Sequence, residues 1–219
     1  MIDEFCQGVM DLEAAFPAIA PKVDVNALHV VYRDNGSVNA RCMFYCYNPP
    51  IVGKRITVLA WIADKYARRG KNYIVTQAVS VDQDGCLLDR VITHELKQPA
   101  EVGKTGPSQF TDTETAHDTL GTSGTVASGR MSLTFATELL RRYFGAEFYN
   151  RGGMVELRFL RPVRPGGTVT FSGKVTGITK VTDGGRVNVE VTATNQKGDV
   201  TAVGTGACIV PSACVPGEE

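Results

Sequence analysis

The chain has no excess of charge of either sign and no long apolar run. Its 219 residues carry 23 Lys and Arg against 23 Asp and Glu, so the formal net charge is +0 at pH 7. A balanced chain has no general attraction to nucleic acid or to an anionic membrane surface. No stretch approaches the ~20 apolar residues that span a bilayer. We therefore expect neither nucleic acid nor a membrane among its partners.

Signals for a metal, a nucleotide cofactor or secretion are also lacking. The six cysteines form no Cys-x-x-Cys pair; they are Cys6, Cys42, Cys46, Cys86, Cys208 and Cys214. The glycine-rich strings at 103–106 and 121–124 do not fit a P-loop. The acidic start, 1–5, has no basic n-region. We expect free thiols in a reducing cytoplasm, with no metal and no cofactor.

What the chain does have is a partial internal repeat. Residues 52–58 resemble 165–171, and 82–85 resemble 195–198. The glycines in these segments match at one constant separation in the numbering, Gly53 with Gly166 and Gly85 with Gly198, which we call the repeat offset. A repeat of this length indicates a duplicated domain rather than a short solenoid repeat. A site between the copies is the first place to look for function.

The apolar periodicity predicts mostly long antiparallel strands with few helices. Expected strands cover 38–47, 55–66, 72–82, 87–96, 154–160, 169–181, 186–194 and 200–210. Expected helices cover 2–16, 112–120 and 129–144. The last is the strongest, with Ser128 as its N-cap and Gly145 at its end. Because its apolar residues lie around most of its circumference, we expect this helix to be buried.

Several segments carry a family resemblance. Residues 124–131 are followed by the Phe144-Gly145 and Gly152-Gly153 pairs and by 158–166, which run Arg-Phe-Leu-Arg-Pro-Val-Arg-Pro-Gly. Together with 64–73, these segments resemble the MaoC-like hydratase/dehydratase family in its double-hotdog form. The resemblance implies an α+β fold, in which two hotdog units each wrap an antiparallel sheet around a helix. The implied boundaries are 1–98 for an N-terminal unit with a degenerate helix, 99–109 for a linker, 110–211 for a C-terminal unit with the site, and 212–219 for a flexible tail.

The sequence departs from the family at the usual catalytic pair. The family's hydratases carry an Asp and a His before a short helix and a second His at the start of the long helix. One alignment places Phe110 at the first His and Ser128 at the second, which removes the pair. Another alignment restores the pair as Asp112 and His117, which have the family's spacing. Asp112 is otherwise an N-cap, and His117 a surface residue.

The start of the long helix remains a candidate site under either alignment. The N–H groups of Gly129 and Arg130 belong to the first helical turn, where backbone donors lack internal partners and the dipole is positive. They could stabilise an oxyanion on a thioester or ketone. Arg130 works against the dipole, so it needs a carboxylate or a ligand phosphate nearby. Our candidate catalytic residues are Asp112, His117, Ser128 and Gly129, with Phe110, Arg130 and Met131 for substrate binding.

The resemblance implies a lyase that hydrates or dehydrates an acyl thioester of coenzyme A or a carrier protein. One alternative is a repurposed double hotdog that dehydrates, isomerises or cyclises a polyketide-like metabolite of secondary metabolism. Another is a non-catalytic subunit that joins a partner hotdog chain. A homodimer is also compatible with the resemblance.

Overall fold

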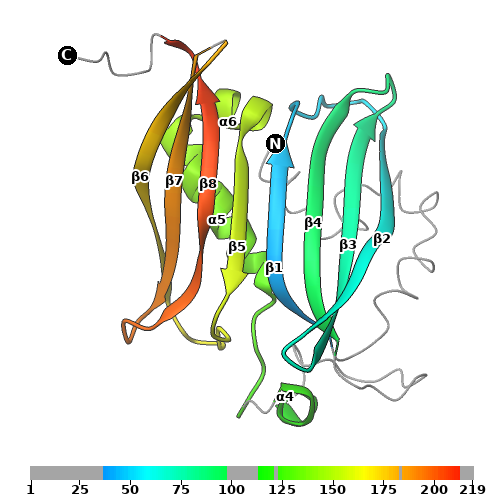
Figure 1. Cartoon of the computed structure of the whole chain (residues 1–219), viewed down its shortest axis with the longest axis vertical. Coiled ribbons are helices and arrows are strands. Elements are labelled where there is room, and N and C mark those ends of the chain that lie inside the picture. Colours follow the sequence, from blue (N-terminus) through cyan, green and yellow to red (C-terminus); the bar gives the residue numbers. More distant parts are fainter. Residues whose placement is uncertain (1–36, 98–112, 121–122, 183, 213–219) are drawn as a thin grey trace.

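The computed structural model describes residues 37–97, 113–120, 123–182 and 184–212. These residues form one eight-stranded antiparallel sheet with the order β2-β3-β4-β1-β5-β8-β7-β6 (Figure 1). The strands are β1 (Ser37–Cys46), β2 (Ile56–Arg68), β3 (Lys71–Asp82), β4 (Leu87–Lys97), β5 (Met154–Phe159), β6 (Val169–Val181), β7 (Gly184–Asn195) and β8 (Val200–Val210). All eight predicted strands are present within a few residues of their predicted bounds.

Three helices accompany the sheet in the described ranges: α4 (Thr113–Leu120), α5 (Gly129–Phe144) and α6 (Ala146–Gly152). The predicted helix at 129–144 has the predicted bounds, with Ser128 as N-cap and Gly145 as C-cap. The sequence reading missed α6. The predicted helix at 2–16, the predicted linker and most of the predicted tail lie outside the described residues. No helix among the described ranges has the length and apolar character needed to cross a bilayer.

The internal repeat has a direct structural counterpart. Strands β6, β7 and β8 begin and end one repeat offset after β2, β3 and β4. The β-bulge between Ile62 and Asp64 recurs at the same offset, between Val175 and Gly177. We call β1–β4 the first unit and β5–β8 the second unit. Their strand orders mirror each other about the central pair of β1 and β5.

The matched turns also repeat atom by atom. Gly85 and Gly198 both have positive φ, 81° and 83°, which glycine adopts without steric cost. The backbone N–H of Arg55 donates to Gln83 Oε1 at 3.2 Å, and that of Thr168 donates to Gln196 Oε1 at 3.1 Å. The two hydrogen bonds are separated by the repeat offset. The glycines that indicated the repeat therefore occupy equivalent turns.

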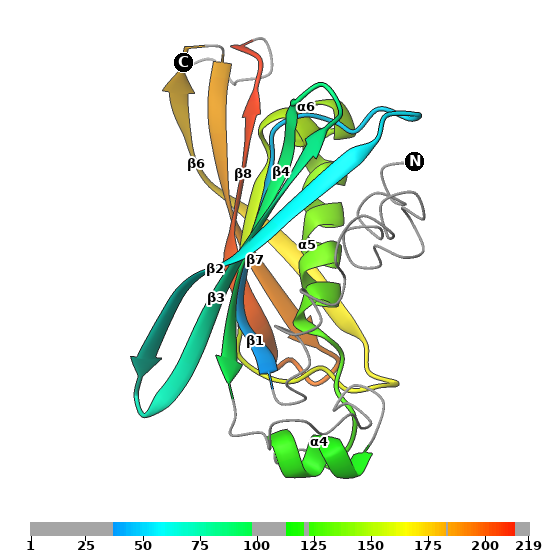
Figure 2. The ribbon, with the colours of Figure 1, turned by 90° about the vertical axis from the view of Figure 1, so that its right-hand side faces the viewer.

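Helix α5 lies across one face of the sheet, which we call the inner face (Figure 2). Its residues Ala136, Leu140 and Phe144 pack into a core with apolar residues of β1, β5, β7 and β8. The expectation that α5 is buried around its circumference is wrong. Met131, Phe135 and Tyr143 are 44%, 56% and 64% exposed, so only one stripe of the helix meets the sheet.

Candidate active site at the start of helix α5

The first turn of α5 is held against the centre of the sheet. Ser128 Oγ accepts a hydrogen bond from the Arg130 N–H at 3.3 Å, which caps the helix. The Met131 N–H donates to the Ser128 carbonyl at 3.0 Å. No residue in the described part of the chain accepts a hydrogen bond from the Gly129 N–H. The geometry therefore leaves Gly129, rather than Arg130, with a backbone donor for a ligand.

Gly129 is packed where β1 and β5 meet. A Cβ at this position would lie 2.9 Å from Phe159 Cε2 on β5 and 3.0 Å from Asn39 Cβ on β1. These separations are below normal contact distances, so only glycine lets the helix start approach both strands. The register of β1 also shifts between Asn39 and Arg41. Bulges of this kind occur often beside active sites, where they redirect side chains.

Next to this helix start lies a row of buried polar side chains on the first unit. Asn39 pairs across the strands with Glu95 of β4, which is only 3% exposed. Thr93 lies two residues away on the same face and is 2% exposed. Cys42, opposite Thr93, directs its thiol to Thr93 Oγ1 at 3.9 Å. A carboxyl, a hydroxyl and a thiol therefore share the inner face near Gly129.

The electrostatics around Cys42 place Arg130 in the same neighbourhood. Burial raises the pKa of the Cys42 thiol to about 11; the charge of Arg130 opposes this rise, and the charge of Glu95 adds to it. Both charges therefore act on one buried atom. A cation in the first helical turn is unfavourable for the helix dipole, and nearby carboxylate charge offsets that cost. Arg130 and Glu95 therefore both lie within electrostatic range of the Cys42 thiol.

The inner faces of the two units differ in polarity. One repeat offset after Cys42, Asp89, Thr93 and Glu95 of the first unit, the second unit has Val155, Ala202, Gly206 and Cys208. The inner face of the second unit packs against α5 as an apolar core. The fold thus accommodates apolar residues at these positions. The row of buried polar side chains thus belongs to the first unit. It approaches the start of α5 through Asn39, which packs against Gly129 and pairs with Glu95.

The structure brings together only part of the site proposed from sequence. Ser128, Gly129, Arg130 and Met131 share the first turn of α5. His117 lies on α4, beyond the end of the sheet near which α5 begins, and its side chain is exposed (Figures 1 and 2). Asp112 and Phe110 lie outside the described residues.

Glu95, Thr93 and Asn39 were missed by the sequence reading. The available signal was alternation in β4, where Asp89, Val91, Thr93 and Glu95 fall on one face. Polar residues at every second position of a strand normally mark its solvent-exposed face. The pattern alone would therefore place Asp89, Thr93 and Glu95 on the outer face of the sheet, whereas they lie on the inner face. Within the described ranges, no group of three or more His, Cys, Asp or Glu side chains is arranged to hold a metal ion.

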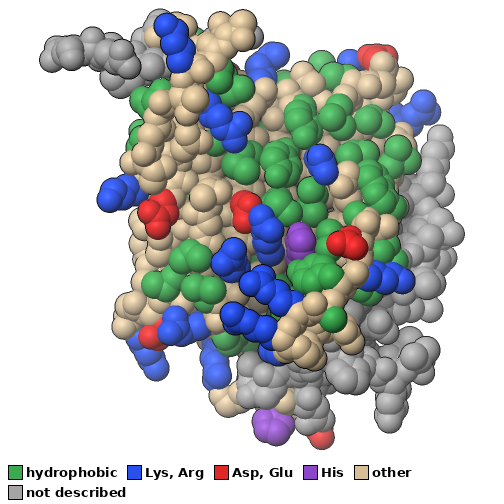
Figure 3. Space-filling model, in the orientation of Figure 1, with side chains coloured by type: hydrophobic (Ala, Val, Ile, Leu, Met, Phe, Trp, Pro, Cys, Tyr) green, Lys and Arg blue, Asp and Glu red, His purple; other side chains and the backbone are tan. Residues whose placement is uncertain are grey.

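His94 is on the other face of β4, and the sequence reading treated it as structural. Its Nδ1 lies 3.1 Å from the Tyr66 hydroxyl, and Tyr66 stacks on Tyr73 with ring centroids 4.8 Å apart. Burial and the charge of Arg41 lower the pKa of His94. This outer face carries both hydrophobic and Lys/Arg side chains (Figure 3). His94 is therefore separated from the helix start by the sheet itself.

Three comparisons bear on the identity of this arrangement. The family model described as "MaoC like domain" matches residues 111–197, a range that contains α4, α5, α6 and strands β5 to β7. No curated protein sequence matches significantly. Many solved structures are similar in fold.

Three of the similar structures match this chain over most of its length. A MaoC-like dehydratase from Phytophthora capsici has a TM-score of 0.63 at 17% identity, covering 83% of this chain and 72% of that one. HtdX of Mycobacterium tuberculosis has a TM-score of 0.61 at 14% identity, covering 84% and 83%. A protein described as an oleoyl thioesterase from Lactobacillus plantarum has a TM-score of 0.57 at 11% identity, covering 94% and 89%. At these identities, the likeness establishes a shared hotdog-type fold.

The matched domain contains the candidate helix start, and the sheet has the hotdog-type architecture of the similar structures. Residues 111–197 therefore match the MaoC-like domain, and the described fold resembles that of solved MaoC-like dehydratases.

Proposed function

We propose that the chain is a double-hotdog hydratase/dehydratase that acts on an acyl thioester at the start of α5. The observation that carries the proposal is the juxtaposition of a backbone donor and a buried carboxyl. The Gly129 N–H has no hydrogen-bond acceptor among the described residues, and Glu95 is buried opposite Asn39, which touches the same glycine.

The Gly129 N–H would stabilise the thioester oxygen during reaction. Addition of water to an enoyl thioester moves electron density onto that oxygen, which makes an enolate. A backbone donor at the positive end of a helix lowers the energy of such an anion most when the site excludes water. The close packing of Gly129 against Phe159 and Asn39 fixes this donor in place.

Glu95 would transfer the protons in place of the family's Asp/His pair. In the hydration direction, its carboxylate takes one proton from water as the water oxygen bonds to the β-carbon. The electron pair of the double bond moves toward the thioester, and a proton is then delivered to the α-carbon. Dehydration reverses these steps. A positioned carboxyl is a suitable general acid–base, and this role typically contributes roughly 10²–10⁴-fold in rate.

Arg130 would set the charge of the site, and Met131 would line its edge. The side chain of Arg130 acts electrostatically on the same thiol as Glu95. Met131 is partly exposed beside the cap and offers apolar contact to an acyl chain.

The direct test is a panel of enoyl thioesters of increasing chain length, on coenzyme A and on a carrier protein. We expect formation of the 3-hydroxyacyl product, detected by mass spectrometry, with the thioester intact. Release of free thiol without hydration would contradict the proposal and indicate a thioesterase. No reaction across the panel would also contradict it.

The variant His117→Ala separates this proposal from the family's usual arrangement. Because His117 is exposed on α4, its loss should change the hydration rate less than about twofold. A loss of activity in this variant, with the fold unchanged by circular dichroism, would assign proton transfer to His117 and not to Glu95.

A repurposed enzyme acting on a ketone is the second candidate. It is favoured by the exposure of His117, since an oxyanion donor alone still serves enolisation of a carbonyl substrate. Dehydration or cyclisation of a polyketide-like ketone, without turnover of any enoyl thioester, would support this candidate. Activity that arises only on mixing with a second hotdog chain would instead identify the protein as a partner subunit.

A further inference from the structure

A second buried carboxyl lies on the inner face of the first unit, far from the start of α5. Asp89 is 2% exposed and pairs across the strands with Ser80 on one side and Cys46 on the other. Ser80 Oγ donates a hydrogen bond to Asp89 Oδ1 at 2.9 Å. The other oxygen, Oδ2, is buried and accepts no hydrogen bond from the described residues. A buried carboxylate oxygen without a donor is costly, so this atom calls for a hydrogen-bond donor.

The second unit shows that the equivalent strand pairing forms without a serine and an aspartate. One repeat offset after Ser80 and Asp89 stand Ala193 and Ala202, which face each other across β7 and β8 in the same register. Both alanines are buried in the second unit. The same strand pairing therefore forms with two methyl groups. Retaining a carboxyl at the equivalent position costs stability, because burial disfavours its charge and raises the pKa of Asp89 to about 6.

The second carboxylate oxygen of Asp89 lies on the face used by the proposed site. Asp89, Val91, Thr93 and Glu95 alternate along β4, and Val91 and Cys46 border the α5 core. The separation of Asp89 from Glu95 corresponds to about 20 Å along an extended strand. A long acyl chain that reacts beside Glu95 and runs along β4 would bring its far end to Asp89.

We propose that Ser80 and Asp89 form a specificity subsite for a hydrogen-bond donor, a hydroxyl or protonated amine, near the distal end of a long acyl chain. The donor would satisfy Asp89 Oδ2, while Ser80 holds Oδ1 and fixes the carboxyl orientation. The pair is a substrate-selecting element with no part in proton transfer at Glu95. The inference rests on the proposed function for the direction of the chain.

The test compares binding of palmitic acid and its ω-hydroxy derivative by calorimetry, which requires no turnover. We expect the wild-type protein to bind the hydroxylated acid at least about tenfold more tightly, as one hydrogen bond to a charged group provides. The double variant Ser80→Ala/Asp89→Ala, which installs the residue pair of the second unit, should bind both acids equally. Thr76→Val is the matched control, because it also installs the second unit's residue, Val189, on the inner face. It should keep the preference.

Equal binding of the two acids by the wild-type protein, a preference that persists in the double variant, or binding of neither acid would each overturn the subsite. If the double variant fails to fold, Asp89→Asn preserves the shape and should reduce the preference. A preserved preference in that variant would likewise overturn the inference. A measured preference in a protein that hydrates no enoyl thioester would support the subsite and reject the proposed function, so the two failures are distinguishable.

Discussion

The thiol groups differ sharply in their surroundings. Burial raises the pKa values of Cys42 and Cys208 to about 11, and both side chains are fully buried. Cys86, in the turn before β4, is exposed. Since the thiolate is the reactive form, burial and a raised pKa both protect Cys42 and Cys208.

In the native protein, iodoacetamide should therefore label Cys86 more than about 100-fold faster than Cys42 or Cys208, because a pKa near 11 lowers the thiolate fraction by roughly two orders of magnitude or more at neutral pH. Mass spectrometry of peptides after timed labelling measures this ratio. Labelling in denaturant is the control and should remove the difference. Equal native rates for Cys42 and Cys86 would show that the inner face is open to solvent.

One single-residue prediction from the sequence is confirmed where the local pattern decides. Ser128 is the N-cap of α5, as helix rules alone predict. Glu95 could not be identified in this way. Its position beside Gly129 depends on the β1–β4 register and on the bulge between Asn39 and Arg41, which are long-range features.

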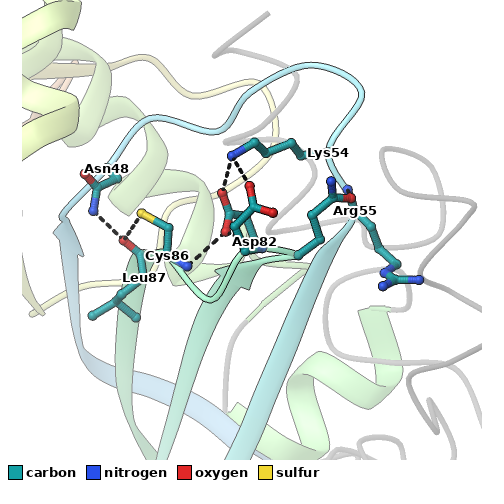
Figure 4. Close-up of polar contacts among 8 residues, drawn as sticks. Asn48, Lys54, Arg55, Asp82, Cys86 and Leu87 are labelled. Carbon is teal, nitrogen blue, oxygen red and sulfur yellow. Dashed lines mark hydrogen bonds and ion pairs between the residues drawn. The ribbon is translucent and has the colours of Figure 1, made fainter.

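At the scale of elements, the turn from β3 to β4 is tied to the loop before β2. Lys54 Nζ lies 3.0 Å from Asp82 Oδ2 and 2.6 Å from Asp84 Oδ2 (Figure 4). Asp82 Oδ1 also accepts hydrogen bonds from the N–H groups of Asp84 and Cys86. In the second unit, Asn195 Oδ1 accepts the same two bonds from Lys197 and Asp199. The ion pair is thus an addition to a shared turn.

Replacing Asp82 by Asn should separate these contributions. Asp82→Asn keeps the acceptor for the turn and loses only the charge, so it should lower the melting temperature less than Asp82→Ala does. The hydrogen bond from Lys54 lowers the pKa of Asp82 in the folded protein. Such a carboxylate stabilises the folded protein fully at pH values above its pKa in the unfolded chain. This stabilisation is lost as the pH falls through the pKa of the folded state.

The difference between wild type and Asp82→Asn should therefore be present at neutral pH and shrink below about pH 4. Melting curves from neutral to strongly acidic pH measure it, and added salt should reduce it at neutral pH. A difference that grows as the pH falls would contradict the role assigned to Lys54. Asp82→Ala serves as the comparison, since it removes the turn acceptor at every pH.

Most elements were predictable because each has a strong local period. The long strands alternate or carry β-branched runs, and α5 has a cap at each end. Helix α6 was missed because it is short and lies between Gly145 and Gly153, where glycines normally indicate loops. The exposed stripe of α5 was also mispredicted, since apolar composition does not reveal which residues meet a sheet.

Across the whole molecule, the repeat was visible in the sequence, but the buried polar side chains of the first unit were not. The sequence reading assigned the site to the second copy and treated the first as scaffold. In the structure, Asn39 of the first unit packs against Gly129 and pairs across the strands with Glu95, so the proposed site draws on both units. The helix at 129–144 has a strong sequence pattern, which favoured the second copy. Buried polar residues such as Thr93 and Glu95 have the same alternating pattern as a solvent-exposed strand face, so the sequence does not distinguish them.

Joining the two units across β1 and β5 brings residues of both units to the proposed site. β5 carries Phe159 and β1 carries Asn39, and both contact the position of Gly129. The second unit supplies most of the apolar surface on which α5 packs, and the first unit supplies the buried polar side chains Thr93 and Glu95. The duplicated halves are equivalent in strand order and turn geometry, and they differ in the side chains of one face.

The hydration rate of Glu95→Gln, on the enoyl thioester that the wild-type protein turns over fastest, shows directly whether Glu95 transfers the proton. We predict a fall in kcat of about 10²–10⁴-fold, because the amide cannot transfer the proton, with the melting temperature close to that of the wild type. Glu190→Gln, the same change at an exposed residue of β7, should retain full activity. Full activity in folded Glu95→Gln would contradict the assignment of the chemistry to the junction between the two units.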